Sequence, residues 1–189
     1  MSDTYEIITV PHASLKQEAH PITNVDDTIR KQMDKMLQTM YDAPGIGLAA
    51  NQVDILNRVL VMDLKKRVER GYEDSDTEEG TKEEEETTGP IFMANPEIIY
   101  ESEEMSVMEE GCLSIPKQYA EVERPAVVRV KYLDYNNKEA ELEASGILSH
   151  CVQHEIDHLN GILFIDYLST LKRNMMVKRV QKLKKQNLL

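Results

Sequence analysis

The sequence has few of the features that mark exported or membrane proteins. It holds two cysteines, Cys112 and Cys151, among 189 residues. That is too few for a disulfide-rich scaffold, so we expect reduced thiols. No stretch approaches the roughly 18 consecutive apolar residues that a membrane-spanning helix needs, and no basic start is followed by a long apolar run. We therefore expect a cytoplasmic protein without membrane contact.

Acidic charge is concentrated in one segment. Residues 73–86 contain nine acids against one lysine, and this excess accounts for two thirds of the formal net charge of −12. The stretch lacks apolar residues to bury, so we predict a mobile, solvated insert at about 66–89. A calcium-binding loop is excluded because the position that needs glycine is Glu79. The chain length suits a single domain over 1–189.

Local patterns predict an α+β protein. Apolar side chains that recur every three or four residues indicate helices, and β-branched or alternating runs indicate strands. The methionines of the first helix follow helical spacing, so we expect them to pack in the core. The predicted elements are a strand Tyr5–Val10, a helix Val25–Tyr41, a Gly-rich turn Gly45–Val53, a strand Arg58–Leu64, an antiparallel meander from Pro90 with a hairpin turn at Asn136–Asn137, and helices over Ser145–Gly161 and Asp166–Lys185.

One helix carries a metal-binding pattern. In HEIDH, His154 and His158 are four residues apart with Glu155 beside the first histidine. On a helix this spacing puts both imidazoles on one face, close enough to share an ion. The motif alone is only moderately specific, because five-residue patterns also occur by chance on protein surfaces.

An open catalytic metal site generally needs a third protein ligand. No histidine or cysteine follows His158, so the ligand must lie upstream. His150 and Cys151 share the helix, but the rise from His150 to His158 is about 12 Å, too long for one ion with bonds of about 2 Å. Cys112 remains, either as the ligand or as an ordinary buried cysteine.

Three separated blocks of the chain are GIGLAANQ (45–52), EEGCLSIP (109–116) and QHEIDHLNG (153–161). In this order they resemble the signature motifs of peptide deformylases. The similarity continues into FIDYLSTLKR, covers most of the chain apart from the acidic insert, and is to the bacterial type that ends in a helix. It implies antiparallel sheets around a central HExxH helix, with an N-terminal and a C-terminal helix. It also implies removal of the formyl group from formyl-methionyl nascent polypeptides.

The resemblance also implies a mechanism. A metal held here would lower the pKa of its water, and the resulting hydroxide would attack the formyl carbon. Glu155 would take the proton and deliver it to the leaving amine, while the Gln52 side chain and the Leu113 backbone N–H would stabilise the oxyanion. The N, N, S donor set suits iron, zinc, nickel or cobalt, and the family suggests Fe(II) in cells. The implied ligands are Cys112, His154 and His158.

By the same resemblance, a peptide-binding surface surrounds this centre. Gly47 and its neighbours would pair with the substrate backbone, and Glu110 and Arg124 would form a supporting ion pair. His150 is a departure, because related enzymes often carry an aliphatic residue there. We expect its titratable ring at the pocket rim to alter inhibitor fit or pH dependence. The substrate pocket would be bordered by Ile46, Gly47, Gly111, Leu113, Ile147, His150 and Cys151.

The last predicted helix is basic and amphipathic. It carries seven lysines and arginines interleaved with Leu171, Met175, Val180 and Leu183. Such a helix ordinarily packs on its domain with a solvated face. The family implies a second use, docking near the ribosomal exit, where RNA phosphates favour positive charge. We expect no DNA partner.

Two rival functions use the same residues. A metalloprotease would cleave internal peptide bonds of unblocked peptides, but such enzymes usually draw a ligand from beyond the helix. A structural or storage metal protein would keep Cys112 and the histidines, but would not need Glu155 or Gln52.

Overall fold

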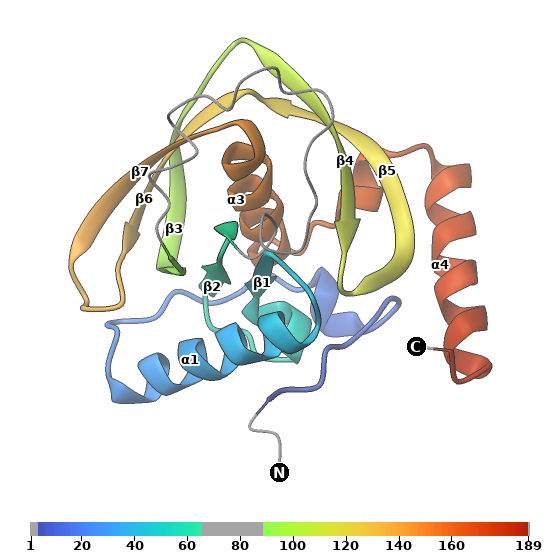
Figure 1. Ribbon diagram of the computed structural model, residues 1–189, viewed down its shortest axis with the longest axis horizontal. Helices are drawn as coiled ribbons and strands as arrows, with labels where there is room; N and C mark the ends of the chain where they lie inside the picture. The colour runs from blue at the N-terminus through green and yellow to red at the C-terminus, as the bar shows by residue number, and fades with distance from the viewer. Residues whose placement is uncertain (1–3, 66–88, 189) are drawn as a thin grey trace.

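The computed structural model describes residues 4–65 and 89–188, so residues 66–88 of the predicted acidic insert lie outside the described residues. One sheet has the strand order β1-β2-β3-β6-β7, and a separate hairpin pairs β4 with β5. Figure 1 shows α3 between the two sheets, α1 below them and α4 on the outer side of β5. The elements are η1 (Ala13–Lys16), α1 (Asp27–Asp42), β1 (Gly47–Ala49), η2 (Ala50–Val53), β2 (Val59–Met62), β3 (Ile91–Glu101), β4 (Met105–Cys112), β5 (Ile115–Pro125), β6 (Val127–Leu133), β7 (Glu139–Ser145), α3 (Gly146–Leu159), η4 (Phe164–Tyr167) and α4 (Thr170–Lys185).

The predicted α+β class, with antiparallel sheets around a central helix, is confirmed. The predicted strand over Tyr5–Val10 is wrong. The Ile8 N–H donates to the carbonyl of Gln52 at 2.9 Å, and the Val10 N–H donates to that of Ser114 at 3.0 Å. The segment is not a strand because its hydrogen bonds go to two separate parts of the chain and not to one neighbouring strand.

Two further boundaries differ from the prediction. The Gly-rich turn contains strand β1, in which Gly47 pairs with Met62 of β2. The C-terminal helix begins at Thr170 and not at Asp166, because Phe164–Tyr167 form a 3-10 turn and the Ser169 side chain caps α4 by accepting from the Lys172 N–H. The hydroxyl of Ser169 thus satisfies a backbone donor that has no partner within the helix.

Helix α3 is buried along most of its length. Its apolar side chains, including Val152, Ile156 and Leu159, pack with Leu60 and Val130 of the five-stranded sheet. Burying each large aliphatic side chain contributes about 1.5–3 kcal/mol. This packing fixes the orientation of α3. It therefore also fixes the positions of the polar side chains on the opposite face of the helix.

Helix α1 supports β1 and β2 from the opposite side. Its N-cap is Asp26, whose side chain accepts hydrogen bonds from the Thr28 and Ile29 backbone N–H groups. Met33, Met36 and Met40 are fully buried against Leu48, Val59 and Val61. The core role predicted for the methionines is therefore confirmed, and α1 fixes the position of β1.

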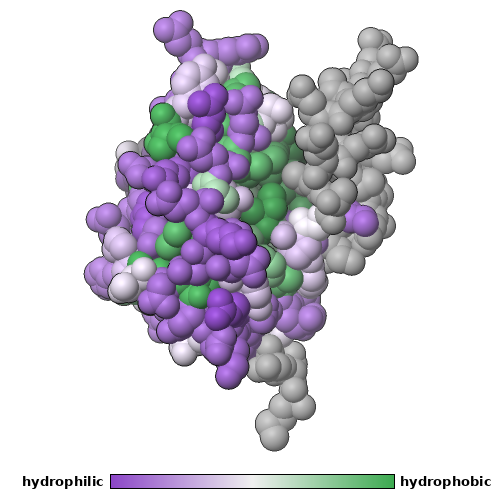
Figure 2. Space-filling view, turned by 90° about the vertical axis from the view of Figure 1, so that its left-hand side faces the viewer, coloured by the Kyte–Doolittle hydropathy of each residue, from purple (hydrophilic) through white to green (hydrophobic). Residues whose placement is uncertain are grey.

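The outer face of β6 and β7 is charged. Arg129 pairs with Glu143 at 3.0 Å and Lys131 with Glu139 at 3.6 Å, while Val128 and Val130 of β6 face the core. Figure 2, which views the molecule from this side, shows a mainly hydrophilic surface with smaller hydrophobic areas. The alternation is that of a sheet with one buried and one solvated face.

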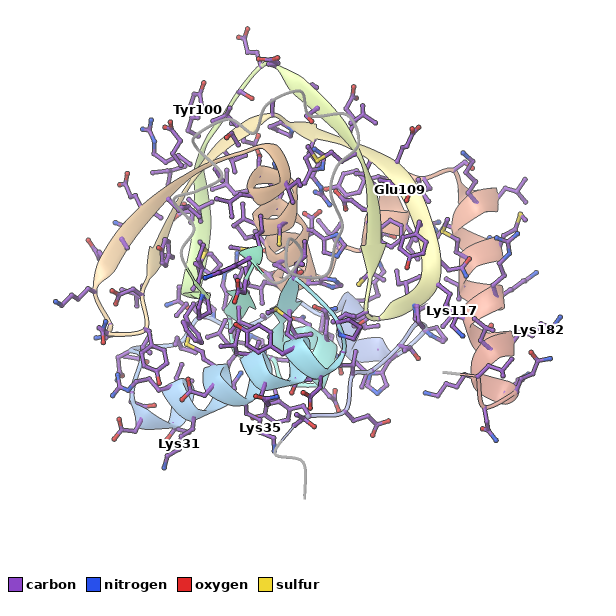
Figure 3. The ribbon with its side chains drawn as sticks, viewed as in Figure 1. Lys31, Lys35, Tyr100, Glu109, Lys117 and Lys182 are labelled. Atoms are coloured by element: carbon purple, nitrogen blue, oxygen red, sulfur yellow. The ribbon has the colours of Figure 1, made fainter. Side chains whose placement is uncertain are left out.

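Helix α4 packs against β5 and η4 through Met176, Val177 and Val180. Its predicted apolar side is only partly buried, because Leu171 is 71% and Met175 44% exposed. Figure 3 shows Lys182 pointing away from the body of the protein. No helix among the described residues is long and apolar enough to cross a membrane.

Candidate metal centre and active site

Helix α3 holds the two motif histidines in the interior. His154 and His158 are 8% and 1% exposed, and their ring centroids are 5.0 Å apart. Burial lowers the pKa of His158 well below its ordinary value, and the nearby His154 and Arg124 lower it further. Burial also acts to lower the pKa of His154, but its hydrogen bonds with Cys112 and Glu110 outweigh this and raise it.

Strand β4 brings Cys112 to these rings. The β4–β5 register shifts between Gly111 and Cys112, and such a bulge re-aims the side chains beside it. The Cys112 Sγ lies 3.2 Å from Nε2 of His158. The ligand atoms of Cys112, His154 and His158 all lie within 4.8 Å of one another, and no other such group occurs in residues 4–65 and 89–188. Tetrahedral bonds of about 2.0–2.3 Å place ligand atoms about 3.4–3.7 Å apart, so this donor set fits one metal ion.

The Glu110 carboxylate contacts the predicted ligand His154 and the Arg124 guanidinium. The carboxylate accepts from Arg124 Nε at 2.6 Å and from Nη2 of the same guanidinium at 3.0 Å, and it lies 2.8 Å from His154 Nδ1. Burial alone would raise the pKa of Glu110. Hydrogen bonds with His150, His154 and Arg124 outweigh burial and hold that pKa well below its ordinary value. An ionised carboxylate at Nδ1 leaves Nε2 of His154 free to bind a metal.

The Glu110–Arg124 pair belongs to a longer chain of contacts. Arg124 Nη1 donates to Asp157 at 2.7 Å, and the Tyr167 hydroxyl donates to the same Asp157 oxygen at 2.8 Å. The guanidinium lies over the Tyr167 ring, 4.9 Å from its centroid. Sequence reasoning did not find Asp157 or Tyr167. The available signal was an acid beside a motif histidine, a common position for a supporting group.

Glu155 lies on the buried side of α3 against β1. Burial raises its pKa to about 7; the His154 ring acts to lower it and the charge of Glu110 to raise it. Its Oε2 has no hydrogen-bond partner among the described residues. A Cβ on Gly47 would stand 2.4 Å from the other carboxylate oxygen, so any side chain at position 47 would displace the Glu155 carboxylate. A carboxyl group whose pKa is near neutrality can both accept and donate a proton.

Gln52 turns its amide toward the same centre. The side-chain oxygen accepts from the Ala49 N–H at 2.9 Å, which orients the group. The amide nitrogen then lies 3.5 Å from Cys112 Sγ and 3.3 Å from Ser114 Oγ. The side chain is 1% exposed, so it is held as a fixed donor beside the predicted ligands.

The predicted pocket residues are brought together in part. Cys151 Sγ lies 3.8 Å from the Ile46 carbonyl, and Leu113 packs so close to Gly45 that a Cβ there would meet it at 2.7 Å. The place of His150 at a pocket rim stays a prediction. Its ring is 4% exposed, and Nδ1 lies 3.2 Å from Glu110. Gly111 is exposed and Ile147 is half-buried at the start of α3.

Comparison with known proteins identifies the family of this chain. Residues 4–174 match the family model described as polypeptide deformylase. A peptide deformylase of Mesorhizobium japonicum is 52% identical over 95% of this chain and 92% of its own. One of Rhizobium meliloti is 50% identical over 93% of this chain and 91% of its own.

Solved structures show the same relationship. A peptide deformylase from Ehrlichia chaffeensis is 38% identical with a TM-score of 0.86, over 98% of this chain and 99% of that one. The enzyme from the same organism in complex with actinonin is 41% identical with a TM-score of 0.83, over 96% and 98% of the two chains. On sequence and on fold, this chain belongs to the polypeptide deformylase family.

Proposed function

We propose that this chain removes the formyl group from formyl-methionyl peptide ends and releases formate. One observation carries the proposal: the ligand atoms of Cys112, His154 and His158 lie within 4.8 Å of one another, and the Gln52 amide nitrogen lies 3.5 Å from Cys112 Sγ. Glu155 is the neighbour of His154 on the same helix. Membership of the family supports the substrate. A protease with the same helix would usually draw its third ligand from further along the chain, whereas here the cysteine comes from β4.

Cys112, His154 and His158 would hold one divalent ion, which supplies Lewis acidity and lowers the pKa of a water. Fe(II) is the proposed ion in cells, and zinc, nickel and cobalt also suit the donors. Glu110 keeps His154 in the tautomer with a free Nε2. These residues therefore bind and orient, and they do not transfer the proton.

Glu155 is the proposed acid and base. Its raised pKa allows it to take a proton from the attacking water and deliver it to the leaving amine. The Gln52 side-chain amide and the Leu113 backbone N–H are proposed to donate to the oxygen on which negative charge develops; loss of one such donor costs about 100-fold or more in rate. The substrate backbone would lie along β1 at Gly47, with its first side chain near Ile46, Leu113 and Cys151.

The test is formate release from formyl-Met-Ala-Ser by protein prepared without oxygen and loaded with Fe(II). Glu155→Gln keeps the shape of the side chain but cannot accept the proton, so we expect the rate to fall by at least about 100-fold with the iron content unchanged. Internal cleavage of unblocked peptides would favour a protease. Unchanged activity in Glu155→Gln would contradict the proposed role.

We also propose that α4 docks to ribosomal RNA through its exposed basic residues, which include Lys182 and Lys185. Replacing both Lys182 and Lys185 by glutamate should weaken co-sedimentation with ribosomes and leave formate release unchanged. Lys31→Glu on α1, also exposed and labelled in Figure 3, is the control. Equal co-sedimentation of all three proteins would contradict this docking.

A further inference from the structure

His150 and the proposed ligand His154 share one carboxylate. They lie one turn apart on α3, and both Nδ1 atoms face Glu110, at 3.2 Å from Oε1 for His150 and 2.8 Å from Oε2 for His154. Arg124 contacts the same two oxygens, Oε1 at 2.6 Å and Oε2 at 3.0 Å. Each oxygen of Glu110 therefore meets one imidazole and one guanidinium nitrogen.

This arrangement sets the tautomer of both rings. A carboxylate has about four acceptor positions and, when ionised, can only accept. With Arg124 donating twice, both remaining positions are filled by imidazoles, so each ring must carry its proton on Nδ1. Glu110 is then fully occupied and cannot turn without breaking one of these contacts.

Within the part of the chain that the structure describes, the Nε2 atom of His150 makes no hydrogen bond that would explain a histidine at this buried position. His150 Nε2 is buried and has no hydrogen-bond partner among the described residues. A buried acceptor without a partner costs stability, which an apolar side chain of similar volume would avoid. The contact with Glu110 is the polar interaction that the structure records for this ring.

We propose that His150 is a positioning residue, whose Nδ1–H fixes the Glu110 carboxylate in the orientation that holds His154 ready for the metal. The inference rests on the proposed metal centre. His150 acts through Glu110, one contact away from the ligand, and has no part in the chemistry itself. The donor that matters is at the Nδ1 position, close to the helix backbone.

Three substitutions of His150 distinguish the effect of the Nδ1–H donor from the effect of the volume of the ring. In His150→Asn the amide nitrogen can occupy the place of Nδ1 and donate to Glu110. His150→Leu has no donor, and the amide of His150→Gln lies further out, near the place of Nε2. Each protein is loaded with Co(II) without oxygen. Transfer of the metal to a chromogenic chelator is then timed, and the Co(II) absorption spectrum is recorded.

We expect His150→Leu and His150→Gln to release Co(II) about tenfold faster than the unaltered chain, because loss of a supporting hydrogen bond weakens metal binding by about 10–100-fold. His150→Asn should stay within about threefold of the unaltered chain and keep its spectrum. If His150→Leu does not fold, the Asn and Gln variants carry the comparison.

Equal release from the Asn and Gln variants, or from His150→Leu and the unaltered chain, would overturn the proposal. Since no substrate is present, this result is independent of the proposed deformylase activity, which formate release tests separately.

Discussion

Gly47 offers the most direct test of the proposed role of Glu155. In Gly47→Ala the new Cβ would stand 2.4 Å from Glu155 Oε1 and 2.8 Å from its Cδ, where ordinary contact begins at 3.4 Å. The carboxylate must therefore withdraw by about 1 Å. Misplacing a catalytic group by about 1 Å costs on the order of 100-fold in rate. We expect kcat/KM for formate release to fall by about that factor, with metal content unchanged.

A double-mutant cycle identifies the cause. In a Glu155→Ala background the carboxylate is absent, so Gly47→Ala should change kcat/KM by no more than about threefold. The assay couples formate release to formate dehydrogenase, with metal measured by elemental analysis. If Gly47→Ala costs the same factor in both backgrounds, the glycine acts on the substrate backbone and not on Glu155, and the reasoning fails.

Two further predictions concern the supporting network. Glu110→Gln leaves buried Arg124 with Asp157 as its carboxylate partner, so the free energy of unfolding in urea should fall by about 3 kcal/mol. Glu109→Gln, on the opposite and exposed face of β4 (Figure 3), should change it by less than about 0.5 kcal/mol; equal losses would contradict the burial argument. Burial, with the charge of Asp157 adding to it, raises the pKa of Tyr167 from 10.0 to about 12, so the folded state holds this proton more tightly than the unfolded chain. That stabilisation is complete below pH 10 and is lost as the pH rises through about 12. In urea titrations the stability difference between the unaltered chain and Tyr167→Phe should therefore be constant below pH 10 and shrink above it, and a difference that stays constant throughout would refute the assignment.

The contacts of Glu110 and Glu155 explain why the pKa values of these two buried glutamates differ. Glu110 touches Arg124 and two imidazoles and is held ionised, whereas Glu155 faces an environment that raises its pKa to about 7. Both are buried side chains of the same type. Their separate roles, support and proton transfer, follow from what each contacts.

Local patterns in the sequence determined the elements that depend on near neighbours. The spacing of Met33, Met36 and Met40 predicts the packed face of α1, and HEIDH predicts two imidazoles on one turn of α3. These predictions succeed because helical periodicity is a property of adjacent turns. The order of three separated motifs also pointed to the family, and the comparisons confirm it.

The resemblance implied that Cys112, His154 and His158 share a metal and that Glu110 pairs with Arg124. Only the tertiary structure showed that Arg124 also reaches Asp157 and that His150 lies beside Glu110. The segment Tyr5–Val10 looks like a strand, yet its hydrogen bonds go to two separate parts of the chain. A side chain's partners and pKa depend on packing between segments far apart in sequence, and that packing exists only in the folded chain.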